Sequence, residues 1–140
     1  MIQFTKEIND LTYKIIGACM KVHNGIGPGF PEEYYQNALV YEFTKQDIPF
    51  EAQKPLIVYY EDVQVGISFL DFLIDDIVIL EIKSLAALNN VHKYQVMKYF
   101  ASSEYSVGLL VNFGAERLQY ERLVPPEKIQ KWKQAQNEKK

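Results

Sequence analysis

The first part of the chain carries apolar residues at helical spacing. Over residues 5–23 they fall on one stripe with the charged residues off it, which predicts an amphipathic helix with Thr5 as its N-cap. The glycine-rich run 24–29 is expected to end this helix. Pro31 then suits the first turn of a second helix, because the acidic residues after it favour a helix N-terminus. The expected buried face of this second helix comprises Tyr35, Ala38, Leu39 and Phe43.

From Ile48 onward the pattern changes to the one that strands show. β-branched and aromatic residues dominate three successive segments, and turn signals separate them at 61–62 and 75–76. The expected strands are 49–60, 64–74 and 77–84. Three strands in sequence favour an antiparallel meander with helices packed on it.

A further helix and two strands complete the predicted order α-α-β-β-β-α-β-β, an α/β (α+β) arrangement. The helix is expected from Asn90, a candidate cap, to about Ser102. The residues that recur in it at helical spacing are Val91, Tyr94, Gln95, Lys98 and Tyr99. Residues 105–112 then predict a buried strand, and 118–124 predict an edge strand.

Composition describes an ordinary globular chain. Its 140 residues fit one domain, and 48% are hydrophobic while 24% are charged. We expect this domain to cover residues 1–124 and a polar, lysine-rich tail, forming a short helix that frays, to cover 125–140. The formal net charge of −3 argues against a protein that coats nucleic acid through bulk positive charge, but it leaves room for a local basic groove.

Cysteine usage and the length of the apolar runs bear on location. Cys19 is the only cysteine, so an internal disulfide cannot form, which favours a reducing compartment. The first residues lack the pattern of a signal peptide, and no apolar run approaches the roughly 20 residues of a membrane span. We therefore expect a cytoplasmic protein without membrane contacts.

Two carboxylates and a lysine interrupt the most apolar part of the chain. Asp71 ends one apolar run, and Glu81 and Lys83 lie two residues apart within the next. Since side chains alternate on a strand, Glu81 and Lys83 share a face, and burying both is costly unless each finds a partner. A carboxylate pair with a lysine is what a magnesium-dependent phosphodiester hydrolase requires. Alternatively, Glu81 and Lys83 form the solvent face of an amphipathic strand. Asp71 can likewise be a residue at the end of a strand with no further role.

A shared site imposes a condition on the loop near Asp75 and Asp76. A two-residue turn there would pair Asp71 with Leu80 and turn Glu81 to the wrong face. An odd-numbered loop or a bulge would bring Asp71 opposite Glu81. We predict the second arrangement.

Four motifs, in order, resemble the GxxExxY group of the PD-(D/E)XK nuclease-like superfamily. They are Gly29-x-x-Glu32-x-x-Tyr35, Asp71 followed by Glu81-x-Lys83, Gln95-x-x-x-Tyr99, and the stretch from Gly108 to Gly114. The resemblance covers about 11–124. It implies a restriction-endonuclease-like core, in which helices pack on a mixed sheet with a three-strand antiparallel meander.

The resemblance also implies an activity, namely Mg²⁺- or Mn²⁺-dependent hydrolysis of phosphodiester bonds in DNA or RNA. Asp71, Glu81 and the carbonyl of Ile82 would hold the ion. Lys83 would stabilise the charge that develops on the phosphate or orient the attacking water. Glu32 would approach the same site, and Gln95 would steady the water or the substrate.

One departure from the family pattern concerns the grip on substrate. Ser68, Phe69 and Leu70 stand where such sequences often carry an arginine just ahead of the aspartate. Its loss removes a phosphate contact rather than a metal ligand. Nucleic acid is the expected partner, and a homodimer stays open because a small nuclease-like fold often needs two copies to span a duplex.

Two other functions stay open beside the nuclease. The same fold can serve as a catalytically inactive module that binds nucleic acid or a protein partner. The ten tyrosines can instead supply the interface of an oligomeric structural protein.

Single residues also have plainer interpretations. Glu32 can act only on the helix dipole, Gln95 can be helix surface, and Tyr35 and Tyr99 can be packing residues. The two histidines lack the spacing of zinc ligands. They are His23 and His92. The tail lysines form either a solvated surface or a nucleic-acid contact. They are Lys128, Lys131, Lys133, Lys139 and Lys140.

Overall fold

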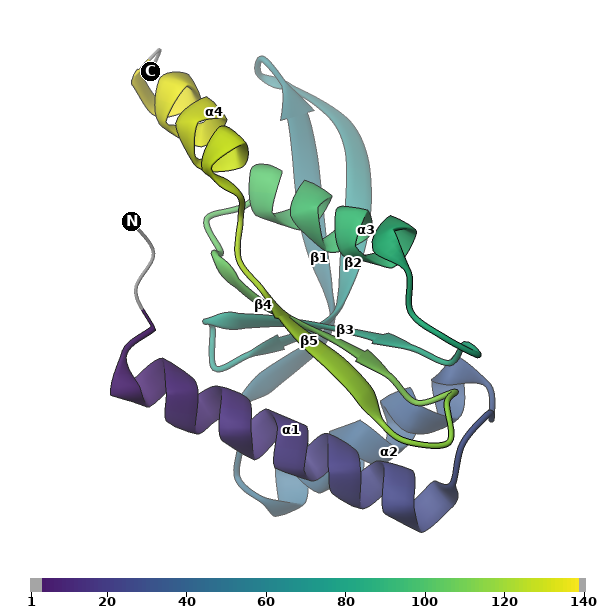
Figure 1. Ribbon diagram of the computed structural model, residues 1–140. Helices are drawn as coiled ribbons and strands as arrows, with labels where there is room; N and C mark the ends of the chain where they lie inside the picture. Colours follow the sequence, from purple (N-terminus) through teal and green to yellow (C-terminus); the bar gives the residue numbers. More distant parts are fainter. Residues whose placement is uncertain (1–3, 139–140) are drawn as a thin grey trace.

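A five-stranded mixed sheet forms the centre of the molecule, with helices on both of its faces (Figure 1). The computed structural model describes residues 4–138, so the expectations for 1–3 and for Lys139 and Lys140 lie outside the described residues. The helices are α1 (Lys6–Ile26), α2 (Glu32–Lys45), α3 (Asn90–Ala101) and α4 (Glu127–Glu138). The strands are β1 (Phe50–Tyr60), β2 (Val63–Ile74), β3 (Val78–Lys83), β4 (Val107–Asn112) and β5 (Gln119–Leu123).

The strand order β1-β2-β3-β4-β5 confirms the predicted meander and the predicted α/β fold class. β1, β2 and β3 pair antiparallel in sequence order. β3 and β4 pair parallel, and α3 makes the crossover between them that a parallel pair needs. β5 returns antiparallel on β4 and forms the edge of the sheet, as expected.

Two apolar clusters sandwich the sheet. α1 and α2 pack on one face, where Ile15, Leu39 and Phe43 meet Phe72 and other strand residues. α3 packs on the other face through Val96 and Phe100. Gly108 of β4 makes room for α3, because a Cβ built there would lie 3.0 Å from Phe100 Cζ and 3.1 Å from Val96 Cγ1. The central strands are therefore buried on both sides.

The helix boundaries differ from the sequence prediction in two places. Thr5 caps α1 by accepting the N–H of Ile8, as predicted, but the helix continues to Ile26. Gly25 remains helical. The helix is ended instead by Gly27, which has a positive φ of 92°. α3 is capped by Asn89 rather than Asn90, because the Asn89 side chain accepts the N–H of Val91.

The face that α3 buries also differs from the expected spacing pattern. Val91 and Tyr94 are 69% and 62% exposed, whereas Val96, Tyr99 and Phe100 are buried. Several of the residues that recur at helical spacing therefore lie on the solvent side. Packing against the sheet, with Gly108 opposite Phe100, selects the other side of the helix.

α2 also buries one acid that its apolar pattern did not reveal. Glu42 lies at the contact between α1 and α2, and its carboxylate is 3.5 Å from the ammonium of Lys21. The amide of Gln46 donates to the same carboxylate.

Within residues 4–138, no helix is long and apolar enough to cross a membrane.

Candidate active site

The loop between β2 and β3 sets the register of the two strands. Ile74 pairs with Val78, and Phe72 with Leu80, so three residues, 75–77, form the loop. Asp75 and Asp76 both take left-handed backbone conformations there, with φ of 51° and 57°, which aspartate tolerates better than most residues. The same register, continued by one step, brings Asp71 opposite Glu81. The prediction of an odd-numbered loop is confirmed.

β2 changes phase at Asp71. Leu70 and Leu73 lie three residues apart yet pack in the same cluster beneath α3, whereas Phe72 faces the opposite cluster. Across from Asp71, between the pairs Ala52–Phe72 and Lys54–Leu70, Gln53 of β1 has φ of 52°. Such irregularities re-aim side chains in a sheet. Here the irregular step lies opposite the candidate aspartate, within β2.

Both carboxylates are inserted between the backbones of β2 and β3. The N–H of Ile82 donates to Asp71 Oδ2 at 2.8 Å, and the N–H of Asp71 donates to Glu81 Oε1 at 3.0 Å. Two backbone amides therefore hold one oxygen of each carboxylate. Because the N–H and C=O of a strand residue point to the same side, the carbonyl of Ile82 shares this space.

The two carboxylates repel each other when both are charged. Glu81 is 2% exposed, and burial together with the nearby Asp71 carboxylate raises the pKa of Glu81 to about 8. Burial also raises the pKa of Asp71, against the N–H of Ile82 and the ammonium of Lys83. A buried pair of acids needs a shared proton or a cation to be neutralised. Lys83 lowers both pKa values without cancelling the rise.

Lys83 is available to this site. Its side chain is half-buried, and it is close enough to influence Asp71, Glu81 and Glu32. Four ion pairs within 4.0 Å occur among residues 4–138, and Lys83 belongs to none of them.

The alternative interpretation, in which Glu81 and Lys83 form the solvent face of an amphipathic strand, is wrong for Glu81, because its side chain is buried.

Glu32 reaches the site through a clamped loop. The hydroxyl of Tyr35 donates to the carbonyl of Gly27 at 2.6 Å and accepts the N–H of Phe30 at 3.1 Å. Gly29, with φ of 81°, turns the chain between these contacts. α2 then begins at Glu32, where burial and the Asp71 carboxylate raise the pKa of Glu32 against the pull of Lys83. Tyr35 is thus both a packing residue and the clamp of this loop.

α3 brings Gln95 and Tyr99 to the other side of the acids. The amide of Gln95 donates to the Tyr99 hydroxyl at 3.0 Å. Burial, and next the Glu81 and Asp71 carboxylates, raise the pKa of Tyr99 to about 12. Side chains from α2, β2 and β3 therefore influence one another's charge, and Gln95 of α3 is linked to them through Tyr99. The residues concerned are Glu32, Asp71, Glu81, Lys83 and Gln95.

Asn112, at the end of β4, fixes the segment that follows Lys83. Its amide donates to the carbonyl of Leu85 and to the side chain of Gln119, both at 2.9 Å. Its oxygen accepts the N–H of Leu85 at 2.8 Å and of Gly114 at 3.1 Å. Gly114 has to be glycine, because a Cβ there would overlap the backbone of Leu85. This junction accounts for Asn112 and Gly114 within the Gly108–Gly114 stretch.

Two glutamines that the sequence did not single out also touch Asp71. The side chain of Gln53 lowers the pKa of Asp71 by hydrogen bonding. The amide of Gln36 donates to the carbonyl of Asp71 at 3.4 Å. Neither contact has a sequence signal. The contact of Gln53 depends on an irregular backbone, and that of Gln36 depends on the angle of α2.

The histidines serve the fold. His23 is buried, and its Nε2 donates to the carbonyl of Ala115 at 3.0 Å. His92 accepts the N–H of Asn89 in the capping box of α3.

The residues fit a hard divalent cation. Among the described residues, no three side chains of His, Cys, Asp and Glu are grouped so that they could hold a metal by themselves. Magnesium, however, is usually held by one or two carboxylates, with waters and substrate phosphate completing its octahedron. A buried and a half-buried carboxylate, both of raised pKa, with a backbone carbonyl beside them, match that requirement.

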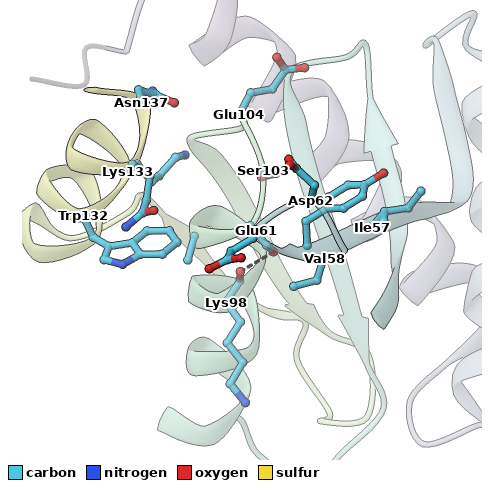
Figure 2. Close-up of a pocket in the computed structure, with 14 residues that line it drawn as sticks. Ile57, Val58, Glu61, Asp62, Lys98, Ser103, Glu104, Trp132, Lys133 and Asn137 are labelled. Carbon is cyan, nitrogen blue, oxygen red and sulfur yellow. Dashed lines mark hydrogen bonds between the residues drawn. The ribbon is translucent and has the colours of Figure 1, made fainter. Parts of the chain in front are cut away.

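A separate groove of 920 Å³ lies between α4, the end of α3 and the distal part of the β1–β2 hairpin (Figure 2). Trp132 and Lys133 line it from α4, and Lys98 from α3. Its acids outnumber its lysines, since Glu61, Asp62 and Glu104 also line it. This groove is not where the carboxylate pair lies, and the chemistry of the pair, rather than the size of the groove, defines the candidate active site.

A mixed five-stranded sheet with an acid pair between β2 and β3 is the arrangement of a nuclease-like α/β domain. The sequence profile of the PD-(D/E)XK nuclease superfamily matches residues 9–123, and the chain belongs to this superfamily. Among solved structures, the chain resembles the crystal structure of SSO0001, with a TM-score of 0.52 and 14% identity. That match covers 96% of this chain and 66% of the other, so the chain spans slightly less than two thirds of the length of SSO0001, and at this identity it shows the fold alone. None of the curated proteins matches the chain.

Proposed function

We propose that the chain is a metal-dependent phosphodiesterase that cleaves nucleic acid. The observation that carries the proposal is the Asp71–Glu81 pair, in which buried Glu81 and half-buried Asp71 are held by backbone amides and repel each other. Asp71, Glu81 and the Ile82 carbonyl would hold Mg²⁺ or Mn²⁺. A bound ion would supply Lewis acidity toward the phosphoryl oxygen and toward water.

The remaining residues position the substrate in this proposal. Lys83 stabilises the charge that develops on the phosphate, an effect of about 2–4 kcal/mol for comparable preorganised donors. Glu32 accepts a proton or orients water at the start of α2, and Gln95 orients the water or substrate from α3. The missing arginine ahead of Asp71 leaves phosphate binding to Lys83 and to groups outside the acid pair.

We also propose that the chain belongs to the GxxExxY group within the superfamily. In this structure each residue of the motif has a distinct role that supports the assignment. Gly29 turns the loop, Tyr35 clamps it, and Glu32 begins α2 beside Asp71. The buried, single Cys19 suits the reducing, cytoplasmic location that we propose.

The test combines cleavage with metal binding. Wild type, Glu81→Gln and Lys83→Met are incubated with mixed single- and double-stranded DNA and RNA and Mg²⁺ or Mn²⁺, and ion binding is measured by calorimetry. Glu42→Gln is the matched control, because it neutralises a buried glutamate away from the site. We expect Glu81→Gln to lose both cleavage and ion binding, Lys83→Met to lose cleavage alone, and the control to keep both.

Two results would separate this proposal from its rivals. Cleavage that is equal in all four proteins would identify a contaminating nuclease. Nucleic-acid binding without cleavage in wild type would favour the inactive binding module instead.

A further inference from the structure

The distal part of the β1–β2 hairpin has an apolar face that no described residue covers. The hairpin extends away from the rest of the sheet (Figure 1). We call this surface the outer hairpin face, and it comprises Pro55, Ile57, Tyr59, Val65, Ile67 and Phe69. Ile57 pairs with Ile67 and Pro55 with Phe69, so these residues stand side by side on the two strands. Ile67 is 50% exposed and Phe69 is 53% exposed.

The opposite face of the same hairpin is partly covered, so the outer hairpin face is the more exposed of the two. Leu56 packs against the cluster beneath α3. Val58 lines the groove toward α4. Ile57 and Tyr59 also border this groove, but the side chain of Ile57 points away from Trp132 (Figure 2). Gly66 and Ser68, which alternate with Val65, Ile67 and Phe69, are likewise half-buried.

The chemistry of the outer hairpin face excludes a nucleic-acid contact and suits a second apolar surface. Residues 55–60 and 63–69 contain no charged side chain. Phosphate binding needs lysine or arginine, and none is present there. Two copies of the same neutral face meet without like-charge repulsion, and an isologous dimer needs such a self-complementary patch.

The geometry favours packing of faces over pairing of edges. β1 is an edge strand, so its backbone offers one free side. Pro55 has no N–H, which interrupts that side near the middle of the strand. The exposed parts of the six side chains amount to roughly 500–600 Å², which is below the roughly 800 Å² per partner of a standard interface and within the range of a weak one.

We propose that two copies of the chain pack through the outer hairpin face to form a two-fold homodimer. The proposal does not depend on the nuclease activity. Phe69 precedes Asp71 by two residues, so the interface would begin beside each acid pair. The modest area predicts a dimer that dissociates on dilution.

Sedimentation velocity over a wide concentration range tests the proposal. We expect wild type to reach twice the monomer mass at high concentration, and Ile67→Asp and Ile57→Asp to remain monomeric. Tyr13→Asp is the matched control, because Tyr13 is 80% exposed on α1, and this variant should dimerise like wild type. Circular dichroism shows that each variant is folded. A monomeric wild type, which would leave the face to a different protein, or an Ile67→Asp variant that dimerises, would overturn the proposal.

Cross-linking gives a second readout that does not require a destabilising charge. A cysteine is introduced as Ile57→Cys, Ile67→Cys or Phe69→Cys and treated with a short bis-maleimide, while the native Cys19 is buried. At least one of these variants should yield a covalent dimer. Tyr13→Cys should not, and equal cross-linking of all four variants would contradict the proposed interface.

Discussion

Two buried glutamates in different regions of the molecule experience opposite electrostatics. Glu42, between α1 and α2, is 5% exposed, and the Gln46 amide followed by Lys21 and Lys45 holds its pKa below the usual value. Glu81, between β2 and β3, is 2% exposed, and its pKa is raised to about 8. The exposed fractions of the two side chains are similar, but their depth and their neighbours differ. Glu42 has partners that favour its charge, whereas Glu81 faces a second acid.

The comparison teaches that burial of a charged residue does not by itself mark a functional site. Glu42 lies beside the exposed ammonium of Lys21, and the Gln46 amide also favours its charged form, so its charge is cheap to keep. Glu81 lies in the centre of the sheet, where the charge is costly. A costly charge that is kept beside another one suggests a role beyond folding.

The largest expected effect on stability concerns Asn112, which is buried and neutral. Asn112→Ala removes four hydrogen bonds and leaves backbone groups of Leu85 and Gly114 unpaired. We expect a loss of roughly 3–5 kcal/mol in the free energy of unfolding. Urea denaturation measures it, with Asn37→Ala on the exposed side of α2 as the control. Equal midpoints for the two variants would refute the role of Asn112.

The two glutamates should respond with opposite sign to the same substitution. At a pH above 8 without metal, Glu81→Gln removes a charge repulsion and should stabilise the fold by about 1–2 kcal/mol. Glu42→Gln removes an ion pair with an exposed lysine and should destabilise it by less than about 1 kcal/mol. Urea denaturation in the presence of a chelator compares them, and effects of the same sign would break the contrast.

The pH dependence of stability should separate the two sites as well. The pKa of Glu81 is raised from 4.5 to about 8, so its contribution is full below about pH 4.5 and is lost as the pH rises through 8. The pKa of Glu42 is lowered, so its contribution is present above 4.5 and is lost as the pH falls below that value. Thermal denaturation of metal-free wild type and Glu81→Gln tests the first part. If both lose stability equally between pH 5 and 9, Glu81 is not the group responsible.

The smallest expected effect concerns the irregular step opposite Asp71. Gln53 holds a left-handed conformation that glycine adopts without strain. Gln53→Gly should therefore change stability by no more than about 1 kcal/mol, with relief of strain offset by lost contacts. It should also raise the pKa of Asp71, because the amide no longer donates to that carboxylate. NMR titration of the Asp71 carboxyl carbon provides the measurement, and an unchanged pKa would remove Gln53 from the site.

The sequence predicted the element order and the register that brings the acids together, because apolar period and loop parity are local properties. It missed the features that depend on tertiary packing. The buried face of α3 follows from Gly108, which is distant in sequence from Val96 and Phe100. Gln53 was invisible because neither it nor its neighbours Ala52 and Lys54 carry a sequence signal for a left-handed residue. Asn112 lies in an apolar stretch, and only the folded chain brings Leu85 beside it.

The three-residue connection after Ile74 has a consequence for how this chain can change over evolutionary time. Its residues can be replaced by any others that tolerate a positive φ where the backbone requires it. Its length, by contrast, cannot change. Adding or deleting a single residue would rotate every later position of β3 to the opposite side of the sheet. We therefore expect descendants of this sequence to accept substitutions at 75–77 and to reject indels there.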